Sequence, residues 1–136
     1  MITAVDSNVL LDVFGAVPAF GPASASALHT ARLEGRLVAC DVVWAEVAGW
    51  FTSKEAAQRA FHVINVEFSP LSLEAAHEAG NCWKSYREKG GTRTRVIADF
   101  LIGAHALHQA DRLLSRDRGF YRSYFKRLSI MDPSAT

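Results

Sequence analysis

Short apolar runs alternate with segments of helical spacing along this chain of 136 residues, and this alternation constrains its fold more than any other feature. The runs predicted as strands are 2–5, 37–40, 66–68, 112–115 and 128–130. The segments predicted as helices are 7–14, 23–34, 41–51, 54–64, 72–87, 97–110 and 119–125. Strands separated by helices pair in parallel, because each return to the sheet needs a crossover. The sequence therefore predicts an α/β fold with a mainly parallel central sheet flanked by helices.

Composition limits the class of protein. Apolar residues make up 49% and charged residues 21%, which is ordinary for a globular domain. We expect one domain over 1–133 and a loose tail over 134–136. A net charge of +1 gives no bulk attraction to nucleic acid or membrane, so any polyanion site must come from local clustering.

Three sequence features indicate where the protein resides. Two cysteines, Cys40 and Cys82, are too few for a disulfide framework and favour a reducing compartment. The first Lys or Arg is Arg32, so no cationic leader is visible, and no apolar run has the length of about 18 residues that a membrane span needs. We expect a cytoplasmic protein without a membrane partner.

Acidic side chains stand where such folds place their ligand sites, beyond the carboxyl ends of the strands. Asp6 and Asp117 come at or just past a strand end, and Glu46 and Asp99 lie in early turns of predicted helices. A carboxylate in apolar surroundings costs several kcal/mol unless it is paired or bound to a cation. Hard divalent cations bind carboxylate oxygens. The pattern predicts an acidic pocket of the kind that metal-assisted phosphodiester hydrolysis requires.

Each acid also has a purely structural interpretation. Asp6 could be only a helix cap, Glu46 a partly buried ion-pair partner, and Asp99 a complement to a helix N-terminus. Asp117 could be a turn residue held by its neighbouring arginines. Spacing alone leaves both interpretations open.

Four short motifs around these acids resemble those of the PIN-domain nucleases, in particular the VapC toxin branch. The opening Asp6-Ser-Asn8 resembles the first motif, and Glu46 in Val-Trp-Ala-Glu-Val the second. Asp99 opens an apolar, Ala-rich segment as in the third, and Ser-Arg-Asp117-Arg-Gly-Phe resembles the fourth. The resemblance runs from Ile2 to about Pro133, in the family's order. Ser7 and Asp41 depart from it slightly, since the family more often has Thr at the first and Ser or Thr at the second.

The resemblance implies a function and a site. Asp6, Glu46, Asp99 and Asp117 would be the catalytic, metal-binding carboxylates for Mg²⁺ or Mn²⁺, with Asn8 and Ser115 as hydrogen-bonding supports. The protein would be an endoribonuclease that cuts structured RNA to leave a 5′-phosphate, and the toxin of a VapBC-type pair inhibited by a small antitoxin. The alternative is a PIN-like scaffold that binds RNA or protein without cutting. Neither the RNA nor the antitoxin is specified by the sequence.

Several other side chains carry separate predictions. Arg116 and Arg118 bracket Asp117, and Arg95 follows the Gly90-Gly91 break; all are candidate phosphate contacts, or simply balance the acids. Asp12 is predicted to be a helix or surface acid. His105 and His108 are interpreted as packed or surface residues. A homodimer through apolar helix faces is expected, with Trp50 and Phe51 as candidates for its interface.

Overall fold

The computed structural model describes residues 1–94 and 96–134. Within them the chain forms one five-stranded sheet in the order β3-β2-β1-β4-β5, and every neighbouring pair is parallel. The strands are β1 (Ile2–Val5), β2 (Arg36–Ala39), β3 (Val66–Phe68), β4 (Arg112–Leu114) and β5 (Ile130–Met131). The predicted α/β class and parallel sheet are confirmed.

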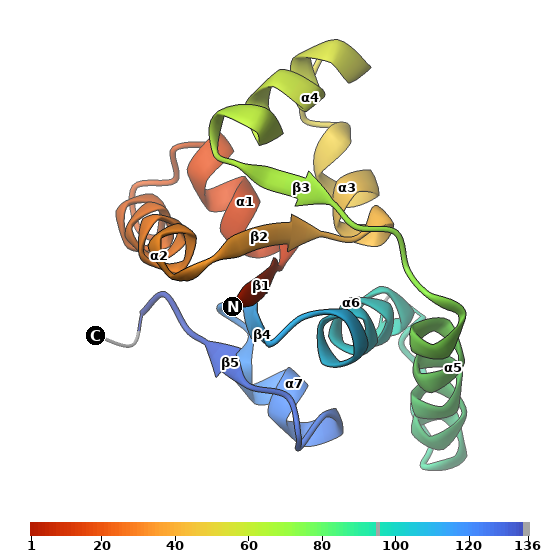
Figure 1. Cartoon of the computed structure of the whole chain (residues 1–136). Coiled ribbons are helices and arrows are strands. Elements are labelled where there is room, and N and C mark those ends of the chain that lie inside the picture. Colours follow the sequence, from red (N-terminus) through yellow and green to blue (C-terminus); the bar gives the residue numbers. More distant parts are fainter. Residues whose placement is uncertain (95, 135–136) are drawn as a thin grey trace.

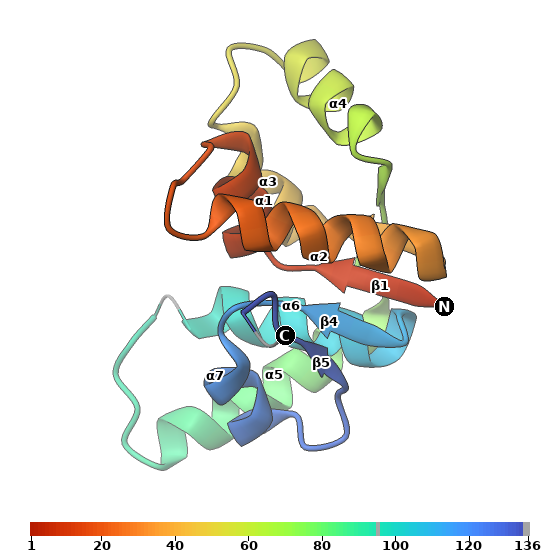
Figure 2. The ribbon, with the colours of Figure 1, turned by 90° about the vertical axis from the view of Figure 1, so that its left-hand side faces the viewer.

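Helices cover the sheet from two sides (Figure 1). They are α1 (Ser7–Phe14), α2 (Gly21–Glu34), α3 (Asp41–Ala48), α4 (Lys54–Val63), α5 (Leu73–Glu88), α6 (Val96–Gln109) and α7 (Arg118–Tyr124). Figure 2 shows α1 and α2 in front of the strands, and Figure 1 shows α5 and α6 packed together on the opposite side. None of the helices in the described part of the chain is long and apolar enough to cross a membrane.

Capping hydrogen bonds explain where three of the helices begin. Asp6, Ser53 and Ser72 each cap a helix by accepting a hydrogen bond from a backbone N–H of its first turn, which satisfies a donor that the helix itself cannot. Three consecutive residues are buried in β1 and three in β2, because parallel strands in the middle of a sheet are covered on both faces; all of them are apolar except Thr3.

Several predicted boundaries differ from the structure by one to three residues. The helix that was expected to run to Phe51 ends at Ala48, so Trp50 and Phe51 lie in the following turn. The last strand is Ile130–Met131, two residues later than the predicted start. Short edge elements carry too few buried side chains for periodicity to mark their ends. Of the predicted tail, Ser134 is described and 135–136 lie outside the described residues, and the division at 133 remains a prediction.

The order of the strands fixes one special position at the carboxyl edge of the sheet. From β1 the chain proceeds to β2 and β3 on one side, whereas β4 and β5 add on the other side. The switch point therefore lies between β1 and β4, where Val5 is in register with Leu114. Ligands of open parallel sheets bind at such a point. The residues that follow these two strands, Asp6 and Ser115, meet there.

Close packing holds α7 beneath this edge. A Cβ added at Gly103 of α6 would come within 2.4 Å of the Phe125 ring, so the absence of a side chain at Gly103 lets the end of α7 approach α6. Tyr121, in the middle of α7, is fully buried. The position of α7 relative to the central strands is thereby determined by core packing.

Candidate active site

Asp6 is the centre of the site at the switch point. It follows β1, caps α1 and is only 4% exposed. Its Oδ1 accepts a hydrogen bond from the Ser7 backbone N–H at 2.8 Å, and its Oδ2 accepts one from the Ser115 hydroxyl at 2.7 Å. The Tyr121 hydroxyl donates to the same Oδ2 at 3.0 Å, and Asn8 Nδ2 lies 3.4 Å from it. A buried carboxylate needs such partners, because leaving it without them would cost several kcal/mol.

Burial is the largest influence on the pKa of Asp6. Loss of water around the carboxyl raises its pKa above the usual value, and the hydrogen bonds from Ser115, Tyr121 and Ser7 act in the opposite direction. The negative charge of Glu46 raises this pKa further. A nearby positive charge would therefore stabilise the ionised form of Asp6.

Glu46 is brought to Asp6 by α3. Its side chain is exposed, and its Oε1 accepts a hydrogen bond from the Ser7 hydroxyl at 2.9 Å. The same hydroxyl lies 3.4 Å from Asp6 Oδ1. Ser7 thus bridges the two acids, a role that the sequence interpretation did not assign to it.

Asp99 lies in the first turn of α6 and is half-buried. Burial and then the charges of Asp6, Glu46 and Asp117 raise its pKa from 3.8 to about 6, and Arg93 opposes this rise. Since each of these carboxylates acts on Asp99 through its charge, the four predicted acids share one electrostatic neighbourhood.

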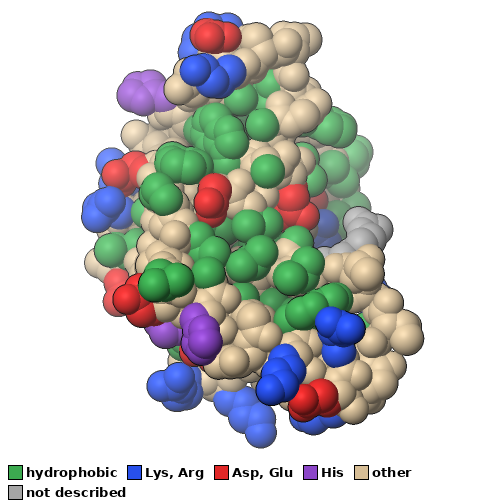
Figure 3. Space-filling model, turned by 90° about the vertical axis from the view of Figure 1, so that its right-hand side faces the viewer, with side chains coloured by type: hydrophobic (Ala, Val, Ile, Leu, Met, Phe, Trp, Pro, Cys, Tyr) green, Lys and Arg blue, Asp and Glu red, His purple; other side chains and the backbone are tan. Residues whose placement is uncertain are grey.

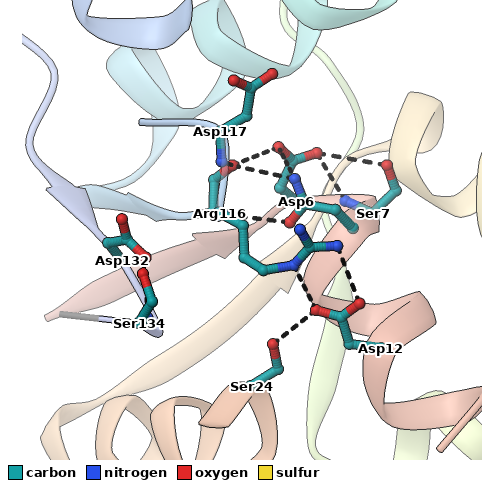
Figure 4. A network of polar contacts seen from close by, with 10 residues as sticks. Asp6, Ser7, Asp12, Ser24, Arg116, Asp117, Asp132 and Ser134 are labelled. Carbon is teal, nitrogen blue, oxygen red and sulfur yellow. Dashed lines mark hydrogen bonds and ion pairs between the residues drawn. The ribbon is translucent and has the colours of Figure 1, made fainter. Parts of the chain in front are cut away.

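Asp117 enters from the other side of the switch point. Its backbone N–H donates to the Ser115 hydroxyl at 2.9 Å, which ties the turn after β4 to Asp6. Its side chain is exposed, and Figure 4 shows it turned away from Asp6. As the side chains stand, no three His, Cys, Asp or Glu residues among those described could hold a metal ion together.

The donor set nevertheless fits a hard divalent cation. Carboxylate oxygens are the ligands that Mg²⁺ and Mn²⁺ prefer. The crowding that raises the Asp99 pKa marks an excess of negative charge, which Arg93 offsets in part. An exposed carboxylate such as Asp117 changes rotamer at little cost. Asp6, Glu46, Asp99 and Asp117 are therefore the residues that would hold the ion.

The arginines divide into different roles. Arg116 donates from Nε and Nη2 to the two oxygens of Asp12, at 2.7 and 3.1 Å (Figure 4). Its guanidinium lies over the Phe20 ring. Arg118 lies 4.0 Å from Asp132. Arg95 lies outside the described residues. Arg116 is thus engaged within the protein, and a contact from it to phosphate remains a prediction.

Asp12, predicted to be a helix or surface acid, lies in α1 but not at the surface. It is only 3% exposed and also accepts a hydrogen bond from Ser24 at 2.9 Å. The sequence feature that corresponds to this burial is the oppositely charged Arg116. Because Arg116 lies more than a hundred residues away, local spacing does not reveal the pair. The two histidines behave as interpreted: buried His105 contacts Ser69, and surface His108 contacts Glu78.

We expect Asp99→Asn to stabilise the protein in chelator at neutral pH. The folded-state pKa of about 6 lies above the ordinary 3.8, so ionisation of Asp99 costs stability as pH rises between these values. The gain should be near zero at about pH 4 and reach about 1 kcal/mol at about pH 8, after allowance for solvent screening of a half-exposed group. Denaturant unfolding at both pH values measures it, with exposed Glu55→Gln as the control. A variant less stable than wild type at the higher pH would mean that Asp99 has a structural role.

Arg116→Gln should destabilise the fold by about 3 kcal/mol, because it leaves the buried Asp12 carboxylate without its bidentate partner. Arg118→Gln is the matched control. Its long, exposed contact to Asp132 predicts a loss below about 1 kcal/mol. Equal unfolding midpoints for the two variants would refute the structural role of Arg116.

Comparisons with known proteins bear on the fold and the family of this chain. No curated protein sequence matches the chain. Among solved structures, VapBC2 from Rickettsia felis bound to a DNA fragment from their promoter is similar at 18% identity and a TM-score of 0.72, over 97% of this chain and 98% of that one. A toxin–antitoxin complex from Klebsiella pneumoniae is similar at 18% identity and a TM-score of 0.66, over 98% of this chain and 99% of that one. VapBC-1 from nontypeable Haemophilus influenzae is similar at 18% identity and a TM-score of 0.67, over 98% of this chain and 99% of that one.

At these identities the solved structures support the fold. The family itself is given by sequence: the model of the PIN domain matches residues 3–126, which include all four acids of the site. The chain therefore belongs to the PIN domain family.

Proposed function

We propose that this protein is a Mg²⁺- or Mn²⁺-dependent endoribonuclease and the toxin of a VapBC-type toxin–antitoxin pair. The observation that carries the proposal is the convergence of Asp6, Glu46, Asp99 and Asp117 on one electrostatic neighbourhood at the switch point of the sheet. Similar folds in VapBC and toxin–antitoxin complexes support the same assignment. All four acids are present, whereas a scaffold without catalysis has no use for this crowding.

Each residue has a defined part in the proposed reaction. A divalent cation in the site supplies a water of lowered pKa and stabilises the leaving oxygen. Asp6 is held rigidly by α1, β4 and α7 through its hydrogen bonds, and Ser7 orients Glu46 toward it. Asn8 and Ser115 connect Asp6 to the turn that carries Asp117. Rigid positioning of charged groups contributes strongly to catalysis, because no reorganisation is needed when the reaction takes place.

Arg93 is the best candidate for a contact to the RNA phosphate. It is exposed, and its charge acts on Asp99. Its backbone N–H donates to the Tyr86 hydroxyl at 3.1 Å, which holds this part of the loop before α6 against an aromatic cluster. A guanidinium beside the acids attracts a phosphate while the acids bind the cation.

We propose two protein partners. A small antitoxin would offer Arg or Lys to the carboxylates, since charge complementarity favours cations there. A second copy of this chain would cover apolar surface: Figure 3 shows hydrophobic side chains gathered across the middle of one face. β3, α5 and α6 border this face and carry exposed Phe68, Leu73 and Ile97, whereas Trp50 is exposed beyond α3. Phe51 packs against Phe14 at a ring distance of 5.2 Å, which makes it a weaker candidate.

Cleavage of RNA tests the nuclease. Purified protein should cut transfer or ribosomal RNA with Mg²⁺ or Mn²⁺, leave a 5′-phosphate, and lose the activity in chelator. Asp6→Asn should lower the rate at least about a hundredfold, because one ligand and the centre of the hydrogen-bond network are altered together. Glu55→Gln on α4 is the control and should cut normally. Binding of RNA without cleavage under any divalent ion would favour the scaffold instead.

Sedimentation of the isolated chain tests the dimer. The expected mass is twice the monomer mass of 14.9 kDa, because an exposed apolar surface of this kind favours association. Replacement of Phe68 by Glu should give a monomer that still unfolds cooperatively, and Glu55→Gln should leave the mass unchanged. A wild-type monomer at micromolar concentration would exclude the homodimer.

A further inference from the structure

Tyr121 supplies the hydrogen bond by which α7 reaches Asp6. It lies in the middle of α7 and is completely buried, yet its hydroxyl donates to Asp6 Oδ2 at 3.0 Å. The Tyr121 hydroxyl is therefore a polar atom on a buried face of α7. It contacts the residue that follows β1, more than a hundred positions away in sequence. A phenylalanine would fill the same space without this hydrogen bond.

The two oxygens of Asp6 are occupied unequally. Oδ2 accepts from the Ser115 hydroxyl at 2.7 Å and from Tyr121 at 3.0 Å, with Asn8 Nδ2 at 3.4 Å. Each carboxylate oxygen has about two lone-pair positions, so these donors saturate Oδ2.

Among the described residues, Oδ1 has one close donor, the Ser7 backbone N–H at 2.8 Å. The Ser7 hydroxyl lies 3.4 Å from Oδ1 but only 2.9 Å from Glu46 Oε1, and its single proton is better placed for Glu46. The described part of the chain therefore leaves one lone pair of Oδ1 open. This lone pair is on Oδ1, the oxygen next to Ser7, and the Ser7 hydroxyl contacts Glu46.

We propose that Tyr121 is a positioning residue that, together with Ser115, holds Asp6 so that only Oδ1 meets the cation. The inference rests on the proposed function, because it concerns the same metal site. Binding through a single oxygen leaves the other coordination positions of the ion to Glu46, Asp99, Asp117 and water, and metal ligands are usually oriented by hydrogen bonds of this kind.

Packing makes Tyr121 effective in this role. Its ring meets Phe120 edge to face at 5.2 Å, and the approach of Phe125 to Gly103 anchors the end of the same helix. A tyrosine has few rotatable bonds, so a buried ring places its hydroxyl precisely. Rotation of the Asp6 carboxylate would break its contacts to Tyr121, Ser115 and Ser7 together.

Tyr121→Phe separates positioning from packing. Titration of the full-length chain with Mn²⁺, with the free ion counted by electron paramagnetic resonance, should show about tenfold weaker binding than wild type, the effect of one lost hydrogen bond to a charged group. Tyr124→Phe, an exposed tyrosine on the same helix, is the control and should bind as wild type does. Far-UV circular dichroism establishes that the variants are folded during the titration.

The outcomes distinguish this inference from the proposed function. Equal Mn²⁺ affinity of wild type and folded Tyr121→Phe overturns the positioning role and leaves the metal site standing. Failure of the wild-type protein to bind Mn²⁺ overturns both. A crystal structure of the wild-type protein with Mn²⁺ gives a second test that needs no variant: we expect the ion on Asp6 Oδ1, and an ion on Oδ2 refutes the inference.

Discussion

The need to stabilise one buried carboxylate organises this molecule. Asp6 ends the central strand, and at 4% exposure it has lost most of its water. Its replacement partners come from three separate parts of the chain: Ser7 from α1, Ser115 from the end of β4, and Tyr121 from α7. The strand order, the β1–β4 register and the packing of α7 must all be correct for these donors to meet. The hydrogen bonds around Asp6 therefore form only when the whole fold is assembled.

Asp12 and the acids around Asp99 differ in how far their charge is compensated within the chain. Asp12 is buried beside Arg116 and Ser24, so its charge is fully compensated within the chain and serves stability. The acids around Asp99 are crowded, and the pKa of Asp99 is raised to about 6 by burial and by its acidic neighbours. A cationic ligand can neutralise negative charge that the protein itself leaves uncompensated. This contrast separates the structural acid Asp12 from the acids that we propose bind the cation.

Sequence patterns predicted the elements near the site well and the peripheral ones less well. β1 and α1 begin and end where expected, because an apolar run followed by Asp6 carries both a strand signal and a cap signal. The helix predicted to reach Phe51 stops at Ala48, since apolar residues at helical spacing also occur in a turn that packs on a neighbouring helix. The motif resemblance identified the four acids as a set, and the family match extends across all of them.

By itself the sequence determined the alternation of strands and helices, hence a parallel sheet, and the acids at strand ends and in early helix turns. These are local properties, set by periodicity and capping within a few residues. Only the tertiary structure decided that Arg116 pairs with Asp12 and that Tyr121 bonds to Asp6. Both contacts join residues more than a hundred positions apart, and one of them turns an aromatic core residue into a hydrogen-bond donor. Such contacts follow from strand order and helix packing, which bring distant side chains together and which no local pattern encodes.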